Sequence, residues 1–446
     1  MSKNKQSTML DRVVSLCKRR GFIFLSSEIY GGLASCWDYG PYGVELKRNV
    51  KSLWWNQMTR MHNDIVGLDS SILMDREVWV ASGHVQSFTD PLVECKECHR
   101  RFRADDLQAD KCPLCGGELT EPKKFNLMFK TYMGPVEDAG SVLYLRPETA
   151  QGIYVNFLNV MTPARQKPPF GIAQIGKAFR NEISPGNFIF RSREFEQMEM
   201  QYFIPPEEAE KWFDYWKEER MRWYIDLLGL NKERLKFRKH ADDELAHYAR
   251  KAVDIEYQFP FGWKELEGIH DRGNFDLSRH KEYSGVDLSY YDQDKGERYI
   301  PYIIETSGGV DRTILSVLCD AYQEEEERVV LKFHPRVAPY LAGVFPLVKK
   351  AGMPELAKRI ADDLKCQFNI FHDIGGSIGR RYRRQDEVGT PYGITVDSQT
   401  LEDETVTIRD RDTMEQIRVR IDELSDVLRK LPECYGRDQG FKNFKS

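Results

Sequence analysis

The spacing of hydrophobic positions predicts a mixture of helices and strands in the first half of the chain. Residues 53–61 have helical spacing, and the apolar run at 65–73 indicates a strand after them. Short apolar runs separated by Gly and Pro favour sheet and loops over residues 121–204. A long helix is expected between Pro205 and Gly229, because large side chains line one side of it: Trp212, Trp216, Trp223 and Leu227.

A buried strand is expected at residues 300–304 and a helix from Asp311 onward. A separate α/β unit of domain size follows after residue 331. It begins with a predicted helix at 353–364 and a strand at 368–371. Its next two strands form a predicted hairpin, with Ile394 and Val396 in one arm and Val406 and Ile408 in the other.

The final segment is predicted to be a helix, because its apolar residues alternate steps of three and four: Met414, Ile417, Ile421, Leu424 and Leu428. Thr413 and Gln416 have the spacing of a capping box at the start of this helix.

The 446 residues, 41% of them hydrophobic and 30% charged, are typical of a globular protein with roughly three domains. The formal charge is 65 − 70 = −5, which by itself indicates no nucleic-acid partner. The N-terminus lacks an apolar signal-peptide core, and no run approaches the roughly 18–20 apolar residues of a membrane span. We therefore expect a cytoplasmic protein with no membrane partner.

Four of the nine cysteines form two close pairs, Cys95 with Cys98 and Cys112 with Cys115. Two CxxC pairs at this separation place four thiolates around one Zn²⁺, and four ligands leave no open position for catalysis. We predict a structural zinc ribbon at residues 93–120; four unconnected thiols are the alternative. The other five cysteines are scattered, which favours a reducing compartment.

The most informative stretch is FRNE at residues 179–182, followed after a short loop by RSREF at 191–195. Two strands joined by a loop present two arginines, an acid and an aromatic ring. Guanidinium groups bind phosphates by bidentate hydrogen bonds, and an aromatic ring stacks on a base. The set therefore fits ATP; an exposed hairpin with surface ion pairs is the alternative.

These two segments resemble motif 2 of the class II aminoacyl-tRNA synthetases. ETSGGVDR at residues 305–312 resembles motif 3, and the helix and strand at 53–73 resemble motif 1, the dimer-forming element. The resemblance implies an α+β fold with an antiparallel-sheet catalytic domain and a C-terminal α/β anticodon-binding domain. The expected division is 1–92 and 121–330 for the catalytic domain, 93–120 for the zinc-ribbon insert and 331–446 for the anticodon-binding domain.

Further phrases resemble the homodimeric glycyl-tRNA synthetases of subclass IIa over residues 10–430. They are GGLA at 31–34, WDYGPYG at 37–43, ASGH at 81–84, RPETAQG at 146–152 and GRRYRRQDEVGTPYG at 379–393. The resemblance implies activation of glycine with ATP and Mg²⁺, transfer of the glycyl group to tRNA(Gly), and a homodimer. Two alternatives stay open: a subclass IIa synthetase for another amino acid, and a non-catalytic RNA-binding relative.

By this resemblance, Arg180 and Arg312 are the catalytic residues and contact the ATP phosphates. Glu265 is expected to carry a carboxylate linked to Mg²⁺. The ATP-binding set that the resemblance implies is Arg180, Asn181, Glu182, Phe190, Arg191, Phe195, Glu265, Leu266, Gly309, Asp311 and Arg312.

Glycine has no side chain to hold, so its selection depends on excluding larger amino acids. The family's glycine-binding positions match Arg103, Glu148, Phe195, Glu199, Glu305 and Ser307. Three carboxylates around one ammonium are complementary to it in charge. A surface ion pair is the ordinary alternative for any single glutamate.

Four arginines flank Tyr382: Arg380, Arg381, Arg383 and Arg384. Such a run binds phosphates or stacks on anticodon bases, which makes it the candidate tRNA contact. A solvated face and a contact with the catalytic domain are the alternatives.

Overall fold

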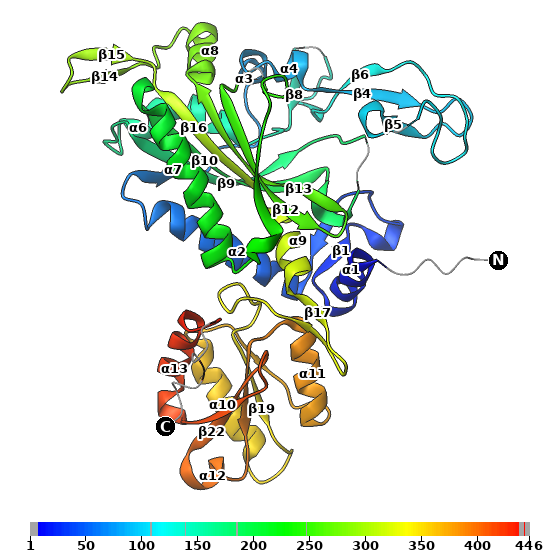
Figure 1. Cartoon of the computed structure of the whole chain (residues 1–446), viewed down its shortest axis with the longest axis vertical. Helices are drawn as coiled ribbons and strands as arrows, with labels where there is room; N and C mark the ends of the chain where they lie inside the picture. Colours follow the sequence, from blue (N-terminus) through cyan, green and yellow to red (C-terminus); the bar gives the residue numbers. More distant parts are fainter. Residues whose placement is uncertain are drawn as a thin grey trace.

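A seven-stranded sheet is the centre of the larger part of the molecule (Figure 1). The computed structural model describes residues 8–107, 109–138, 140–183, 186–246, 248–436 and 441. Neighbouring strands are antiparallel except β3 with β9, which are parallel. In spatial order the strands are β11 (Leu235–Lys239), β12 (Lys251–Phe259), β13 (Gly262–Gly273), β16 (Tyr302–Gly309), β10 (Glu194–Ile204), β9 (Phe170–Phe179) and β3 (Ile65–Gly67).

Helices cover one face of this sheet. They are α1 (Met9–Arg20), α2 (Pro41–Thr59), α7 (Ala209–Arg222) and α9 (Val310–Ala321), which share one hydrophobic core with the sheet. Met198, Met200 and Tyr202 of β10 point into that core. Because side chains alternate along a strand, the residues between them point to the opposite face, where the polar side chains of the site gather.

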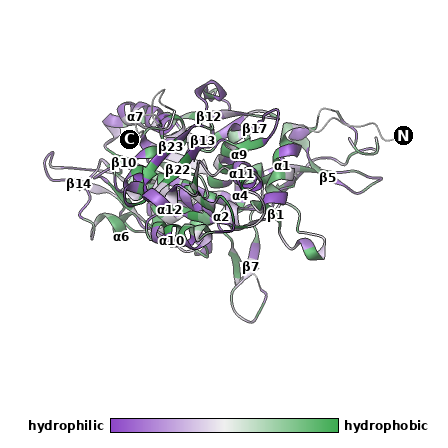
Figure 2. Cartoon of the chain, turned by 90° about the horizontal axis from the view of Figure 1, so that it is seen from below, coloured by the Kyte–Doolittle hydropathy of each residue, from purple (hydrophilic) through white to green (hydrophobic). Residues whose placement is uncertain are grey.

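Smaller elements surround the open face. The helices α5 (Ala150–Val155) and α8 (Phe275–Ser284) form a second core with one end of the sheet. A three-stranded sheet of β4 (Thr89–Glu94), β5 (Arg101–Arg103) and β6 (Lys123–Asn126) lies beside the open face. The hairpins β7 (Lys130–Tyr132) with β8 (Val142–Tyr144), and β14 (Tyr290–Asp292) with β15 (Glu297–Tyr299), project from the body (Figure 2).

The C-terminal unit has its own mixed sheet and core, below the large sheet in Figure 1. Its strands are β20 (Ile370–His372), β19 (Ala342–Pro346), β21 (Tyr392–Val396), β22 (Thr405–Asp410) and β23 (Gln416–Arg420), in that spatial order. The first three strands are parallel and the last two are antiparallel additions. Its main helices are α10 (Met353–Lys365), α11 (Ile378–Val388) and α13 (Leu424–Lys430).

The remaining elements are short. They are β1 (Ile23–Leu25), β2 (Trp37–Tyr39), α3 (Arg76–Ala81), α4 (His84–Ser87), α6 (Phe157–Met161), β17 (Tyr322–Glu324), β18 (Val329–Leu331) and α12 (Thr400–Asp403). None of the helices in the described part of the chain is long and apolar enough to cross a membrane.

Most of the predicted elements are confirmed, with shifted ends. The helix at 53–61 is the last part of α2, and the helix expected before Gly229 is α7 followed by a π-helical turn. The strand at 65–73 ends at Gly67, whereas the strand at 300–304 runs from Tyr302 to Gly309. The helices at 353–364 and from 311 onward, the strand near 368–371 and the hairpin are present.

The prediction for the final segment is wrong in its first half. Residues 416–420 form strand β23, which pairs with β22, and helix α13 begins only at Leu424. Thr413 does not cap a helix; its hydroxyl donates to Asp410 in the turn before β23. Ile417 and Val419 are buried at a spacing of two, a strand pattern that the steps of three and four concealed.

Candidate functional site

A polar cavity of about 280 Å³ lies on the open face of the large sheet. It brings together residues from motif-like segments that are far apart in the sequence. Its lining includes most of the predicted site residues: Glu148, Arg180, Glu182, Phe190, Arg191, Phe195, Glu199, Glu265, Glu305, Ser307, Gly309, Asp311 and Arg312. The cavity is therefore the candidate site for ATP and glycine.

Strand register explains how these residues meet. Glu199 of β10 lies opposite Ser307 of β16, and Gly268 of β13 lies opposite Ser307 on the other side. In the same way, His270 of β13 lies opposite Glu305. Residues two apart share a face, so three adjacent strands present a block of polar side chains to the cavity. At Gly268 a side chain would collide with the His270 ring, only 2.5 Å from an added Cβ.

Arg180 is held between two aromatic rings. Its guanidinium carbon lies 5.3 Å from the Phe88 ring centroid and 5.2 Å from that of Phe195. Its Nε donates to the Pro147 carbonyl oxygen at 3.0 Å. These contacts orient the side chain. Because the hydrogen-bond acceptor is a neutral carbonyl oxygen, the positive charge of Arg180 is left for a ligand in the cavity.

Arg312, at the start of α9, occupies the opposite part of the cavity. Its guanidinium stacks on Phe190 at 4.5 Å from the ring centroid and pairs with Glu265 at 3.0 Å. Arg312 holds the pKa of Glu265 below its usual range although burial opposes ionisation. Asp311, beside Arg312, points away from it and accepts hydrogen bonds from Tyr39, Lys47 and the Glu196 amide.

Two of the three predicted glycine-binding carboxylates, Glu148 and Glu305, lie beside basic side chains. The Glu148 carboxylate lies 3.3 Å from His84 Nε2 and accepts from Gln151 at 3.0 Å. Burial alone would raise the pKa of such a carboxyl, yet its neighbours His84 and Arg272 hold the pKa of Glu148 below its usual range.

Glu305 has the strongest partners of the three. Its oxygens lie 2.8 Å from His270 Nδ1 and 2.9 Å from an Arg272 nitrogen. Arg272 is buried, pairs also with Asp276 at 2.7 Å, and stacks on Tyr248 at 3.7 Å from the ring centroid. Against the effect of burial, Arg272 and His270 lower the pKa of Glu305 to about 2.

Glu199 has neutral partners instead. Thr149 donates its hydroxyl to one carboxylate oxygen, and Gln201 donates to the other at 2.9 Å. Burial, and then the negative charges of Glu305 and Glu148, raise the pKa of Glu199 well above its usual range. The pKa values of the three glutamates are therefore shifted in different directions although the side chains line one cavity.

The mouth of the cavity is close to the three-stranded sheet of β4, β5 and β6, here called the cysteine-rich sheet because its loops carry the four paired cysteines. Arg191 pairs with Asp106 of that sheet's loop at 3.4 Å. Burial raises the pKa of Glu182, on the same side of the cavity. Arg103 lies outside the cavity lining and pairs with Asp90 at 3.4 Å, so a direct contact of Arg103 with glycine stays a prediction.

Two predicted ATP-binding residues also lie outside the lining. The Leu266 side chain is completely buried in the hydrophobic core on the other face of the sheet. The backbone N–H of Asn181 donates to the Leu127 carbonyl oxygen at 2.7 Å. Only the main chain of Leu266 is left for contact with ATP; the roles of both residues stay predictions.

Sequence reasoning missed several residues of the cavity: Gln197, His240, Tyr248, Asp254, His270 and Arg272. The signal was present for part of this group. His270, Asp271 and Arg272 are three consecutive titratable residues in an otherwise buried part of a strand, and such a run indicates a polar site. The pairing of His270 and Arg272 with Glu305 was not readable, because it depends on strand register.

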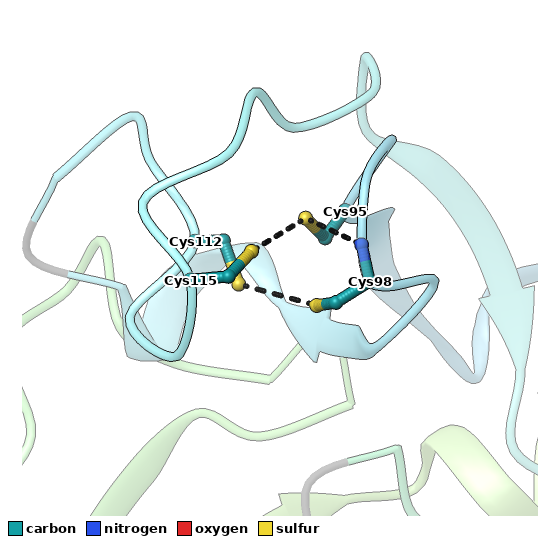
Figure 3. A group of neighbouring side chains, drawn as sticks. All are labelled: Cys95, Cys98, Cys112 and Cys115. Atoms are coloured by element: carbon teal, nitrogen blue, oxygen red, sulfur yellow. Dashed lines mark hydrogen bonds between the residues drawn. The ribbon is translucent and has the colours of Figure 1, made fainter.

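The four paired cysteines converge at the loops of the cysteine-rich sheet (Figure 3). Their sulfur atoms all lie within 4.8 Å of one another. The Cys95 and Cys115 sulfurs are 3.5 Å apart, and those of Cys98 and Cys112 are 3.7 Å apart. Tetrahedral zinc with bonds of about 2.3 Å separates its sulfur ligands by about 3.8 Å, so this arrangement fits a Cys₄ zinc site.

The arginine run lies on α11, at the boundary between the two parts of the molecule. Arg381 is 1% exposed and donates to the Pro346 carbonyl oxygen at 2.7 Å, so its side chain is not presented at the surface and its contact with tRNA stays a prediction. Arg383 pairs with Glu327 at 3.1 Å and Arg384 with Asp373. Arg380 is exposed.

The same helix is joined to the catalytic part by ion pairs. Glu387 pairs with Arg20 of α1 at 2.6 Å, and Asp386 pairs with Arg328 at 2.9 Å. The alternative of a contact with the large domain is therefore the better description of α11.

Comparisons with known proteins agree with this geometry. Residues 130–321 match the family described as "tRNA synthetase class II core domain (G, H, P, S and T)", and residues 342–431 match the "Anticodon binding domain". These matches confirm the predicted fold class.

Among curated proteins, the chain is 58% identical to a glycine–tRNA ligase of Treponema denticola, over 96% of this chain and 98% of the relative. Glycine–tRNA ligases of Borrelia hermsii and Clostridium acetobutylicum are each 54% identical to it, over 94% and 95% of this chain and 97% and 99% of the relatives. The chain therefore belongs to the glycine–tRNA ligase family of class II aminoacyl-tRNA synthetases.

Proposed function

We propose that the protein activates glycine with ATP and transfers the glycyl group to tRNA(Gly). In the first step the glycine carboxylate attacks the α-phosphorus of ATP, which forms glycyl-adenylate and releases pyrophosphate. In the second, a hydroxyl of the 3′-terminal ribose takes the glycyl group and AMP leaves. The observation that carries this proposal is one cavity in which Arg180, Arg191 and Arg312 of the proposed ATP site lie with the three glutamates of the proposed glycine site.

Three arginines of the cavity supply positive charge where the reaction needs it. Arg180 is proposed to bind the α-phosphate, where negative charge accumulates as the carboxylate attacks. Arg312 and Arg191 bind the terminal phosphates, with Phe195 stacked on adenine and Glu182 reading its amino group. Positioning and charge neutralisation carry the reaction, so no covalent enzyme intermediate is required.

The glutamates are proposed to bind the ammonium group of glycine. Glu148, Glu199 and Glu305 come from three different segments and face the same part of the cavity. Ser307 lies between them on the floor of the sheet, opposite Glu199. A side chain larger than hydrogen would have to enter this crowded region, so exclusion provides the selectivity for glycine.

The test is ATP–pyrophosphate exchange with purified protein, offering glycine, alanine, serine, proline, threonine and histidine separately without tRNA. Glycine alone is expected to support exchange. Exchange with another of these amino acids would replace glycine as the substrate, and no exchange with any of them would favour the non-catalytic RNA-binding alternative.

Two metal ions are proposed. Mg²⁺ would accompany ATP near Glu265, where the buried Asp254 adds a second carboxyl to the cavity lining. Zn²⁺ would be bound by Cys95, Cys98, Cys112 and Cys115 and would fix the loops of the insert. The zinc contributes structure only, because all four positions around it are taken by protein sulfur.

Replacing one thiolate is expected to remove the zinc. Cys98→Ser should lower the zinc content from one ion per chain to near zero, because three sulfurs and a hydroxyl bind zinc far more weakly. Elemental analysis after dialysis measures this, and limited proteolysis should then cut within residues 93–120. Cys366→Ser is the matched control, since Cys366 is exposed on the C-terminal unit and should keep full zinc. Full zinc in Cys98→Ser would contradict the site.

We propose that residues 331–446 bind the anticodon arm, and that residues 1–92 and 121–330, with the insert at 93–120, form the catalytic part. The loops that follow the parallel strands β19 and β20 lie at one edge of the C-terminal sheet. We define the loop-edge patch by six exposed residues at this edge, five from the loops and Arg380 from the start of α11: Leu347, Val348, Lys349, Lys350, Ile374 and Arg380. Apolar side chains beside cations suit unpaired bases and their phosphates.

Neutralising the patch is expected to weaken tRNA binding alone. Lys349→Gln/Lys350→Gln/Arg380→Gln should raise the KM for tRNA and reduce the slope of log Kd against log salt by up to about 3, one for each lost phosphate contact. ATP–pyrophosphate exchange should not change. Lys358→Gln/Lys365→Gln on α10 is the control for loss of positive charge elsewhere on the same unit, because both lysines pair with Asp362 outside the patch. Equal effects of the two variants would contradict a specific patch.

A homodimer in the cytoplasm completes the proposal. The resemblance to motif 1 and the nearly bare side chains of Ile29 and Tyr30, 88% and 87% exposed, support a second copy covering part of this surface. All nine cysteines are free, which fits a reducing compartment. Light scattering coupled to size exclusion tests the dimer, and a monomer mass at micromolar concentration would contradict it.

A further inference from the structure

The three glutamates of the glycine pocket do not have equivalent partners. Glu148 has His84, and Glu305 has both His270 and the buried Arg272. In the part of the chain that the structure describes, no Lys, Arg or His forms an ion pair with Glu199, which accepts only from Thr149 and Gln201. Glu199 is 2% exposed, so water does not compensate for a missing counter-ion.

We propose that glycine is the counter-ion of Glu199 and that its binding releases the proton that Glu199 carries in the empty pocket. This inference rests on the proposed function, because it requires the ammonium group to enter among these glutamates. It assigns the three acids different tasks. Glu148 and Glu305, whose pKa values are lowered by their basic neighbours, are ionised at neutral pH and attract the cation, whereas Glu199 changes its charge when the cation arrives.

The groups that face Glu199 support this division. From the segment before α5 it faces Glu148, from β16 Glu305, and from β13 Arg272, which is already bound to Glu305 and Asp276. Arg146, which lies over Gly176 of β9, donates to the carbonyl oxygens of Lys177 and Ser70. Two negative charges and burial thus oppose a third charge on Glu199 until a cation binds.

The proton balance sets the sign of the pH effect. The empty pocket holds Glu199 as a carboxylic acid; the occupied pocket holds a carboxylate beside the glycine ammonium, and one proton leaves to solvent. Binding that releases a proton strengthens as pH rises, until the pH exceeds the pKa of Glu199 in the empty pocket. The KM for glycine should therefore fall by up to about tenfold per pH unit below that pKa.

The experiment is calorimetric titration of the full-length, zinc-replete protein with glycine, in buffers of different ionisation enthalpy. The dependence of the observed heat on buffer is expected to show release of close to one proton near neutral pH. The KM for glycine in ATP–pyrophosphate exchange, measured from about pH 6 to about pH 8, should fall as stated. Glu199→Gln should raise the KM by about 10–100-fold and should abolish both the proton release and the pH slope.

Glu148→Gln is the matched control, because it removes a carboxylate of the same pocket that is already ionised. It should weaken glycine binding yet keep the release of one proton, with the pH slope moved to lower pH by the loss of a negative neighbour. Glycine binding without proton release in the unmodified protein, or equal loss of release in both variants, would overturn the inference while leaving the proposed function standing. Absence of any glycine-dependent exchange would remove the proposed function itself, and this inference with it.

Discussion

Replacing Arg180 with alanine is expected to reduce the rate of ATP–pyrophosphate exchange by about 10²–10³-fold, the usual cost of one charge-stabilising group in a transition state. The guanidinium is held between the Phe88 and Phe195 rings and hydrogen-bonded to Pro147, so it is already oriented before ATP binds. Its charge is proposed to meet the charge that develops on the α-phosphate. The loss should appear in kcat and kcat/KM alike, because the interaction is strongest in the transition state.

Arg180→Lys should recover little of this activity. An ammonium is a point charge that cannot form the planar, two-pronged hydrogen bond of a guanidinium or stack between the two rings. Arg298→Gln is the control, since Arg298 is an exposed partner of Asp287 on the β14–β15 hairpin and should leave exchange unchanged. Exchange by Arg180→Ala within tenfold of the unmodified protein, with an intact fold by circular dichroism, would remove Arg180 from the proposed mechanism.

The sequence predicted the residues of the cavity best where short segments carried them. Arg180, Glu199 and Glu305 were found because each stands in a phrase with characteristic spacing, and the register of β10 with β16 then makes Glu199 and Glu305 diagonal neighbours. Arg272 was not found, although it is buried and bound to Glu305. Its partner is 33 residues away in the sequence, and only the register of β13 with β16 brings them together.

The errors in the fold have a similar origin. Residues 416–420 satisfy helical and strand spacing over the same five positions, and pairing with β22 decides between them. The arginine run suggested an exposed cationic helix face, but Arg381 is needed inside the C-terminal unit, where its guanidinium satisfies backbone carbonyl groups. Local sequence shows the charge of such residues and does not show which side of the helix faces another part of the chain.

Breaking the buried pair of Arg220 and Glu267 should strongly destabilise the catalytic part. Both side chains are completely buried, and two guanidinium nitrogens contact the carboxylate at 2.6 and 3.1 Å. Arg220 also stacks on Trp223 at 4.6 Å from the ring centroid. Arg220→Met is expected to lower the free energy of unfolding by about 3–5 kcal/mol, because it leaves an unpaired carboxylate in the core.

The double variant Arg220→Met/Glu267→Leu separates this cause from a simple loss of packing. Removing both charges should recover most of the stability in urea unfolding followed by tryptophan fluorescence, since apolar pairs often replace buried ion pairs at little cost. Breaking the exposed pair of Arg298 and Asp287 is the control, and it should change the free energy of unfolding by less than about 1 kcal/mol. If the double variant were no more stable than Arg220→Met, packing of the arginine would be the cause.

Glu267 lies opposite Gly308 in register and two residues from Glu265, so an unpaired charge there acts on the sheet directly beneath the cavity. The single variant should therefore lose exchange activity at lower urea concentrations than the double variant.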